Sequence, residues 1–122
     1  MDVKNKRVVV TGAASGIGKA LCEAFHEADV QSIVAVDMNL DGAQETADLV
    51  NGIAVQANVG IEKDITNVIQ KADEHSGGTD IFCSNAGIGG VPGFFEVEAS
   101  DWQNIWDVNV QSHIFAAKHV LP

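Results

Sequence analysis

The sequence is poor in several residue types, and each shortage excludes a kind of site or partner. It contains no tyrosine, so it offers no phenolic hydroxyl for acid–base chemistry. Cys22 and Cys83 are its two cysteines, too few for a disulfide scaffold and too far apart for a redox or zinc motif, so we expect both to be reduced and buried. The sequence has only seven basic residues, scattered along the chain, and seventeen acidic ones, which gives a formal net charge of −10. This balance disfavours nucleic acids and anionic membranes as partners.

Long apolar runs and metal-binding patterns are also missing. No stretch reaches the length of a membrane span and no signal-peptide pattern is found, so we expect a cytoplasmic protein. The histidines form neither an HExxH motif nor another ligand pattern, which predicts no metal site; they are His26, His75, His113 and His119. The sequence does offer 122 residues, 46% of them apolar, which is enough for one soluble globular domain with a core.

The most informative stretch is residues 11–18, which read Thr-Gly-Ala-Ala-Ser-Gly-Ile-Gly. The β-branched run at 8–10 before it is typical of a strand buried on both faces, and the apolar residues after it recur at helical spacing. A glycine-rich turn from strand to helix suits a dinucleotide pyrophosphate, because the first amides of a helix are unsatisfied and lie at its positive end. We assign Gly12 to the tight turn, Gly16 to the approach of phosphate oxygens and Gly18 to close packing of the helix. A tight connection without a ligand would use the same residues.

A carboxylate follows the second apolar run at an informative spacing. Residues 32–36 lead into Asp37, about 20 positions after the last glycine of the turn, the offset at which an acidic group reaches the adenosine ribose. Such a carboxylate accepts hydrogen bonds from both ribose hydroxyls and repels a 2′-phosphate. Because neither Ser15 nor Met38 is basic, we expect NAD rather than NADP. The alternative is that Asp37 merely caps a helix or a turn.

Strand and helix signals alternate along the whole chain. Strands are expected at 7–11, 32–37, 53–57 and 80–84, and helices at 16–28, 41–50, 61–74 and about 100–120. Gly77 and Gly78 are expected to end the third helix, and a glycine-rich loop with Pro92 follows the fourth strand over residues 88–93. Alternation without a linker or repeat predicts one α/β domain, with a parallel sheet, right-handed crossovers and helices on both faces.

The last helix carries a second feature. We expect a capping box of Ser100 and Gln103 to begin it. The predicted stripe on one face comprises Trp102, Ile105, Trp106, Asn109, His113, Ala116, Ala117 and Val120. Asn109 interrupts this stripe, and because a buried amide needs hydrogen bonds, it either ties two helices together or serves a site. Trp102 and Trp106 are expected to anchor packing rather than to stack on a ligand. The opposite face is apolar as well, which predicts a cover from a partner subunit.

Five features stand in register along the chain. They are TGxxxGxG at 11–18, Asp37, Asn85-Ala86-Gly87, Asn109 and the final Leu121-Pro122. Together they resemble the NAD(P)-dependent short-chain dehydrogenase/reductase family over the whole chain. The resemblance implies a doubly wound, NAD(P)-binding Rossmann fold and hydride transfer between a nicotinamide cofactor and a carbonyl or alcohol substrate. It also implies a homodimer or homotetramer built on the helix at 101–121.

The resemblance further implies a role for each matching residue. The pyrophosphate site would comprise Gly12, Ser15, Gly16, Ile17 and Gly18. The adenosine ribose would be held by Asp37 and Met38, with Val108 touching the adenosine side. Closure over the cofactor and support of the fourth strand would come from Asn85, Ala86 and Gly87. The water of a proton relay would be held by Asn109.

The sequence departs from the family pattern in two places. Asn58-Val59 stands where the family commonly has Asp-Val, although an amide oxygen can still accept a hydrogen bond from the adenine amino group. The family's catalytic serine and the tyrosine and lysine of its YxxxK motif would lie beyond Pro122. In the family that tyrosine is the general acid or base, and the lysine lowers its pKa and holds the nicotinamide ribose. We therefore expect residues 1–122 to be the amino-terminal cofactor-binding part of a single domain, inactive by itself.

The sheet gives an independent reason to expect more chain. In a doubly wound sheet the fourth strand is interior. A sheet that stopped there would leave Ile81, Phe82 and Cys83 as a bare apolar edge, which favours aggregation. Strands five to seven and the tyrosine are expected from the rest of a longer polypeptide or from another chain.

Three function classes remain open on the sequence. The first is an NAD-dependent dehydrogenase or reductase acting on an alcohol or ketone, and the second is a non-catalytic NAD-sensing module. A methyltransferase is the third, since that fold also joins a glycine-rich turn to an acidic residue, but the Asn85-Ala86-Gly87 turn and the TGxxxGxG spacing speak against it. Phe94 and Phe95 either line an entrance for substrate or pack under their own loop.

Overall fold

Strands and helices alternate in the computed structural model, which describes residues 1–90 and 93–122. The first three units are β1 (Arg7–Thr11) with α1 (Gly16–Glu27), β2 (Ser32–Asp37) with α2 (Leu40–Leu49), and β3 (Ile53–Gln56) with α3 (Glu62–Ser76). A short β4 (Ile81–Cys83) follows, and then α4 (Ala99–Trp106), the π-helical segment η1 (Asp107–Gln111) and α5 (Ser112–Val120). The predicted alternation is confirmed. Val91 and Pro92, part of the predicted glycine-rich loop, lie outside the described residues.

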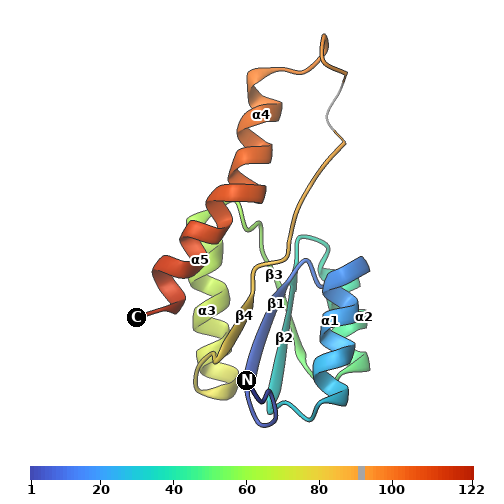
Figure 1. Cartoon of the computed structure of the whole chain (residues 1–122), viewed down its shortest axis with the longest axis vertical. Helices are drawn as coiled ribbons and strands as arrows, with labels where there is room; N and C mark the ends of the chain where they lie inside the picture. Colours follow the sequence, from blue (N-terminus) through green and yellow to red (C-terminus); the bar gives the residue numbers. More distant parts are fainter. Residues whose placement is uncertain (91–92) are drawn as a thin grey trace.

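The four strands form one parallel sheet in the order β3-β2-β1-β4. The chain begins in the interior of the sheet, winds outward through β2 and β3, and then crosses to the other side of β1 to form β4. Helices α1 and α2 lie on one face, and α3 and α5 lie on the other (Figure 1). This is the expected doubly wound, Rossmann-like arrangement. Among the described helices, none is long and apolar enough to cross a membrane.

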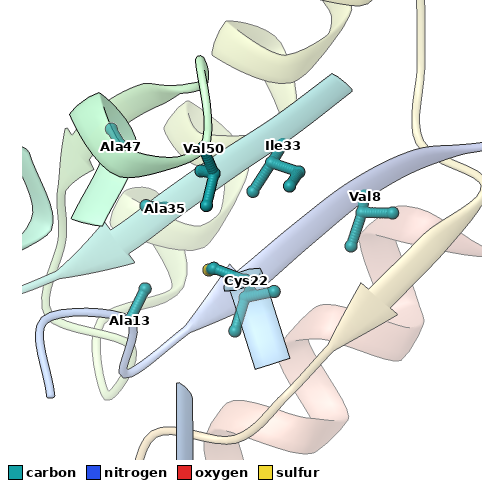
Figure 2. Packing of buried hydrophobic residues seen from close by; sticks show 8 residues of the cluster. Val8, Ala13, Cys22, Ile33, Ala35, Ala47 and Val50 are labelled. Atoms are coloured by element: carbon teal, nitrogen blue, oxygen red, sulfur yellow. The ribbon is translucent and has the colours of Figure 1, made fainter. Parts of the chain in front are cut away.

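The core lies on both faces of the two inner strands, because alternate residues of a strand point to opposite sides. On the first face, β1 and β2 pack against α1 and α2, and the fully buried cluster there comprises Val8, Val10, Ala13, Cys22, Ile33, Ala35, Ala47 and Val50. Figure 2 shows these side chains gathered above the two strands. On the second face, Val9, Val34 and Val36 pack against Val68 and Ala72 of α3. The continuous apolar runs of the sequence thus mark strands buried on both faces, as predicted.

The predicted capping box of Ser100 and Gln103 is wrong. Helix α4 begins at Ala99, and its capping box is formed by Glu98 and Asp101, two residues before the predicted pair. The Glu98 N–H donates to Asp101 Oδ2 at 2.8 Å. Both residue pairs have the required spacing, but Glu98 has the extended backbone of an N-cap residue (φ −104°, ψ 167°), whereas Ser100 lies inside α4.

The long final helix is confirmed, but its predicted apolar stripe is only partly right. The π-helical segment η1 widens the turn in the middle, so the buried face shifts relative to a regular helix. The buried residues of the final helix are Val108 in η1 and Ser112 and Ala116 in α5. The Ser112 hydroxyl donates to the Val108 carbonyl at 2.6 Å. Trp102 and Trp106 are 55% and 53% exposed, so they do not anchor packing within the described chain. Helix α4 buries none of its residues and extends beyond the end of the sheet (Figure 1).

Candidate dinucleotide-binding site

The glycine-rich turn joins β1 to α1 as predicted, and two of its glycines are fixed by geometry. Gly12 has a φ of +72°, a left-handed conformation that side-chain-bearing residues rarely adopt. A Cβ at Gly18 would overlap the carbonyl oxygen of Gly12. Gly18 therefore allows the first turn of α1 to sit directly over the end of β1, which refines its predicted role in helix packing.

The first turn of α1 presents its amides without a side-chain cap. Ser15 is the N-cap residue, and among the described residues its side chain makes no capping hydrogen bond. Ile17, predicted to line the pyrophosphate site, is 72% exposed. The first amides of a helix without a cap are available to an anion, and the helix dipole favours negative charge there.

Asp37 ends β2 beside this turn, and both of its carboxylate oxygens accept backbone hydrogen bonds. Oδ2 accepts from the Ala14 N–H at 3.1 Å, and Oδ1 accepts from the Asn39 N–H at 3.0 Å. The turn-forming alternative for Asp37 is therefore realised. It does not exclude the ribose role, because each carboxylate oxygen has a further lone pair and Asp37 lines the cleft described below.

Helix α2 holds the same turn from the other side. The Thr46 hydroxyl is fully buried and donates to the Ala13 carbonyl at 2.8 Å. The Ala13 N–H donates to the Val36 carbonyl at 3.0 Å. A Cβ at Gly42 of α2 would lie 2.8 Å from the Ala14 Cβ, so α2 packs directly on the turn. Sequence reasoning missed Thr46, because it reads only as a small residue on the inner face of a helix.

The turn after β4 is tied to β1 through Thr11. The Thr11 hydroxyl accepts from the Asn85 and Ala86 N–H groups at 2.9 and 3.1 Å, and the Asn85 side chain donates to the Thr11 carbonyl at 3.1 Å. Asn85 and Ala86 are thereby held at the end of β1. Sequence reasoning used Thr11 as part of a motif but did not assign it this bracing role.

Asn109 lies in η1, and both polar atoms of its side chain form hydrogen bonds with the backbone of Ile88. Its Oδ1 accepts from the Ile88 N–H at 2.8 Å, and its Nδ2 donates to the Ile88 carbonyl at 2.8 Å. Asn109 therefore ties the last helix to the segment after β4, not to another helix. Its predicted role in holding a relay water stays a prediction.

A cleft with a volume of about 100 Å³ lies at the carboxyl ends of the four strands. Its lining comprises Gly12, Asp37, Met38, Ala57, Asn58, Val59, Ala86, Gly87, Ile88 and Val108. Eight of the predicted site residues thus meet in one cleft. Six others lie outside this lining: Ser15, Gly16, Ile17 and Gly18 at the start of α1, and Asn85 and Asn109, which bond its walls. Open α/β sheets bind ligands in this position, beside the point where the winding direction reverses.

A comparison with family models adds a decisive observation. The model described as short chain dehydrogenase matches residues 6–122. The chain belongs to the short-chain dehydrogenase family. This membership favours the dehydrogenase over the methyltransferase alternative.

Similar proteins include curated relatives and solved structures. Glucose 1-dehydrogenase 2 of Bacillus subtilis is 35% identical over 98% of the chain and 49% of its own length. The crystal structure of hydroxysteroid dehydrogenase from Escherichia coli has a TM-score of 0.91 at 28% identity, over 98% of this chain and 52% of that one. A Burkholderia phymatum short-chain dehydrogenase/reductase in complex with NAD has a TM-score of 0.93 at 25% identity, over 100% and 45%. The chain therefore spans about half the length of the relatives that it matches.

Asn58, which stands where the family commonly has aspartate, takes part in a local turn. Asn58 Oδ1 already accepts from the Gly60 N–H at 2.9 Å, and the Asn58 N–H donates to Asp64 Oδ2 at 2.9 Å. The amide oxygen predicted to meet the adenine amino group is thus partly engaged in forming its own turn. One lone pair of the oxygen and the side-chain NH₂ remain for a ligand.

Neither of the two cysteines lines the cleft. Both cysteines are free, as predicted, and Cys22 is buried. The predicted burial of Cys83 is wrong: this residue is only partly buried, because it lies in β4 at the edge of the described sheet. Burial raises the pKa of the Cys22 thiol to about 11 and also raises the pKa of Cys83, so neither is a ready nucleophile. In the part of the chain that the structure describes, no three His, Cys, Asp or Glu side chains are grouped to hold a metal ion.

Proposed function

We propose that this chain is the cofactor-binding part of an NAD-dependent oxidoreductase that transfers a hydride between NAD(H) and an alcohol or ketone. The single observation that carries the proposal is the placement of Asp37 in one cleft with the glycine-rich turn. A carboxylate there accepts hydrogen bonds from the two hydroxyls of an adenosine ribose and repels a 2′-phosphate. The neighbouring Met38 and Ser15 supply no cation to offset that repulsion.

The residues of the cleft fit an adenine dinucleotide. We propose that the first-turn amides at Ser15, Gly16, Ile17 and Gly18, with Gly12, hold the pyrophosphate. Met38, Asn58, Val59 and Val108 provide an apolar slot with one amide for the adenine ring, and Asn85, Ala86 and Gly87 close the opposite side. The coenzyme, when bound, supplies the hydride acceptor or donor. The chain's own residues bind and orient it.

We further propose that the complete protein adds the proton-transfer residues. The sequence has no tyrosine, and the family resemblance assigns the general acid or base to a tyrosine. Supporting observations are the position of β4 at the edge of the described sheet and a groove of about 310 Å³ beside it, lined in part by Phe82, Ser84, His113 and Val120. A further strand would fill such a groove. Asn109 would then position a water of the proton relay.

The proposal includes a subunit contact through the helix at 101–121. Trp102, Trp106 and Ile114 of this helix are all more than half exposed, so they leave an apolar surface uncovered on it. We propose a second copy of the protein as its cover, in a homodimer or homotetramer. A cytoplasmic location is proposed with it, because NAD is available there and the free thiols Cys22 and Cys83 stay reduced.

Calorimetric titration of the full-length natural protein tests the proposed function. We expect heat on addition of NAD or NADH, much weaker binding of NADP, and none for S-adenosylmethionine. Absence of binding by NAD and NADH in properly folded protein would overturn the proposal.

A second candidate is a non-catalytic NAD-sensing module, in which the same cleft would bind NAD. It predicts the same titration but no turnover of any alcohol or ketone by the full-length protein. A YxxxK motif in the rest of the polypeptide would decide for the enzyme.

A further inference from the structure

The peptide unit between Ala13 and Ala14 is held at both of its polar ends. Its carbonyl, on Ala13, accepts from the buried Thr46 hydroxyl at 2.8 Å. Its N–H, on Ala14, donates to Asp37 Oδ2 at 3.1 Å. No cis peptide occurs among the described residues, and in a trans peptide the C=O and N–H point in opposite directions. The two hydrogen bonds therefore fix one rotational setting of this peptide plane.

We infer that Thr46 is a positioning residue for ribose selectivity: by holding the Ala13 carbonyl, it aims the Ala14 N–H at Asp37 and so fixes the carboxylate that faces the adenosine ribose. The inference rests on the proposed function, in which Asp37 binds that ribose. Thr46 itself does not line the cleft. It acts from α2 through the Ala13–Ala14 peptide.

Burial gives this contact its importance. Ala13 and Thr46 are both fully buried, and a buried carbonyl that loses its donor is unfavourable. A water is poorly placed to substitute, because Gly42, one turn before Thr46, lies so close to the turn that a Cβ there would meet the Ala14 Cβ at 2.8 Å. Without the hydroxyl, rotation of the peptide plane becomes the way to satisfy the carbonyl. That rotation takes the Ala14 N–H away from Asp37.

Calorimetry with NAD and NADP on full-length variants tests the inference. Thr46→Val keeps the shape and removes the hydroxyl, whereas Thr46→Ser keeps the hydroxyl. For Thr46→Val we expect the Kd for NAD to rise about tenfold. The Kd for NADP should rise less, because a 2′-phosphate does not depend on the carboxylate as an acceptor, and the preference for NAD should therefore fall. Thr46→Ser should stay within about twofold of the wild type for both ligands.

Thr66→Val is the matched control. Thr66 lies on α3 and its hydroxyl also donates to a backbone carbonyl, that of Lys63 at 2.8 Å, but this contact is remote from the turn. Unchanged NAD preference is expected for it. If Thr46→Val keeps the wild-type Kd values for both ligands, the inference is overturned while the proposed function stands. If the wild type binds neither ligand, the proposed function fails and the inference with it.

If the Thr46→Val protein does not fold, two further measurements still test the inference. Thr46→Ala and Thr46→Ser differ only by the hydroxyl, so equal NAD preference in these two variants would also overturn the inference. Hydrogen exchange of the wild-type protein without ligand gives a readout independent of binding. The Ala14 amide should exchange slowly, and exchange at the rate of an unprotected amide would contradict the fixed peptide plane.

Discussion

The two flanks of β1 differ in how they are held together. On the β2 side, the glycine-rich turn, Asp37 and α2 are joined by backbone and side-chain hydrogen bonds over a fully buried cluster. On the β4 side, Ile81, Phe82 and Cys83 are only partly buried, and α4 has no buried residue. The contacts that shape the proposed adenosine site thus lie within the described chain, whereas those that would cover the β4 side do not. We therefore expect binding of the adenosine half of the coenzyme to be separable from catalysis.

The largest expected effect comes from a substitution at Gly18, which disrupts the packing of the glycine-rich turn on the β2 side. A Cβ there would overlap the Gly12 carbonyl, which is backbone and cannot move aside cheaply. Gly18→Ala should lower the free energy of unfolding by roughly 3 kcal/mol and abolish measurable NAD binding. Urea unfolding and calorimetry of the full-length protein would measure both effects.

Gly89→Ala is the matched control for this substitution. A Cβ at Gly89 meets nothing within 4 Å, so its stability and NAD affinity should equal those of the wild type. A stable Gly18→Ala protein with normal affinity would show that the turn is not packed as the structure describes.

A smaller effect is expected at Asp37, where the charge can be removed without introducing a clash. Asp37→Ala should weaken NAD binding by about 10- to 100-fold, since charge-assisted bonds to the ribose and the bonds from the Ala14 and Asn39 amides are all lost. The preference for NAD over NADP should fall, because the repulsion of a 2′-phosphate disappears. Titration with both dinucleotides measures the two effects, with Asp41→Ala, an exposed residue in the first turn of α2, as control. Unchanged discrimination would refute the selectivity role of Asp37.

The β2 side of β1, with the glycine-rich turn and Asp37, was also the part of the structure that the sequence could predict. Strands β1 and β2 were predicted to the residue, since continuous β-branched and apolar runs leave little choice for chains buried on both faces. The turn and Asp37 could be placed because glycine and carboxylate spacing is a local signal. Thr46 could not, because its partner Ala13 lies 33 positions away in sequence and only packing of α2 on the turn brings them together.

The wrong sequence predictions concern the last helix, on the β4 side of the sheet. The residues of η1 carry no local sequence signal that separates a π turn from a regular helix, so the stripe drawn on regular spacing missed Ser112 and included the exposed His113 and Ala117. Two overlapping pairs, Glu98 with Asp101 and Ser100 with Gln103, satisfied the spacing of a capping box. The structure places the extended N-cap conformation at Glu98, and spacing alone does not distinguish the two pairs.

The exposed apolar surface at Trp102, Trp106 and Ile114 gives a sharper test of the β4 side. If a second copy covers it, Trp106→Ser should raise the dissociation constant of the oligomer by about tenfold or more, as expected for a buried aromatic anchor. Light scattering during size-exclusion chromatography of the full-length protein would show a shift toward smaller species. Leu49→Ser, at a residue of α2 that is 57% exposed, should leave the assembly unchanged. An unaltered mass for Trp106→Ser would argue against this helix as the subunit contact.

The smallest expected effect concerns the polar link between α3 and α5. Glu62 accepts from Lys118 Nζ at 2.6 Å and from His119 Nε2 at 2.8 Å, and these bonds, that from Lys118 foremost, hold the pKa of Glu62 below its ordinary value. A carboxyl group with a lowered pKa in the folded state stabilises the protein above its unfolded pKa of about 4.3, and this contribution is lost as the pH falls through the folded value. Glu62→Gln should therefore melt slightly below the wild type at pH 7, and the difference should shrink as the pH falls below the unfolded pKa. Since the link is exposed, added salt should reduce the difference too. Glu74→Gln, whose only described ionic contact is Lys71 at 3.6 Å, should show a still smaller change. A Glu62→Gln deficit that does not shrink on acidification would point to packing rather than charge.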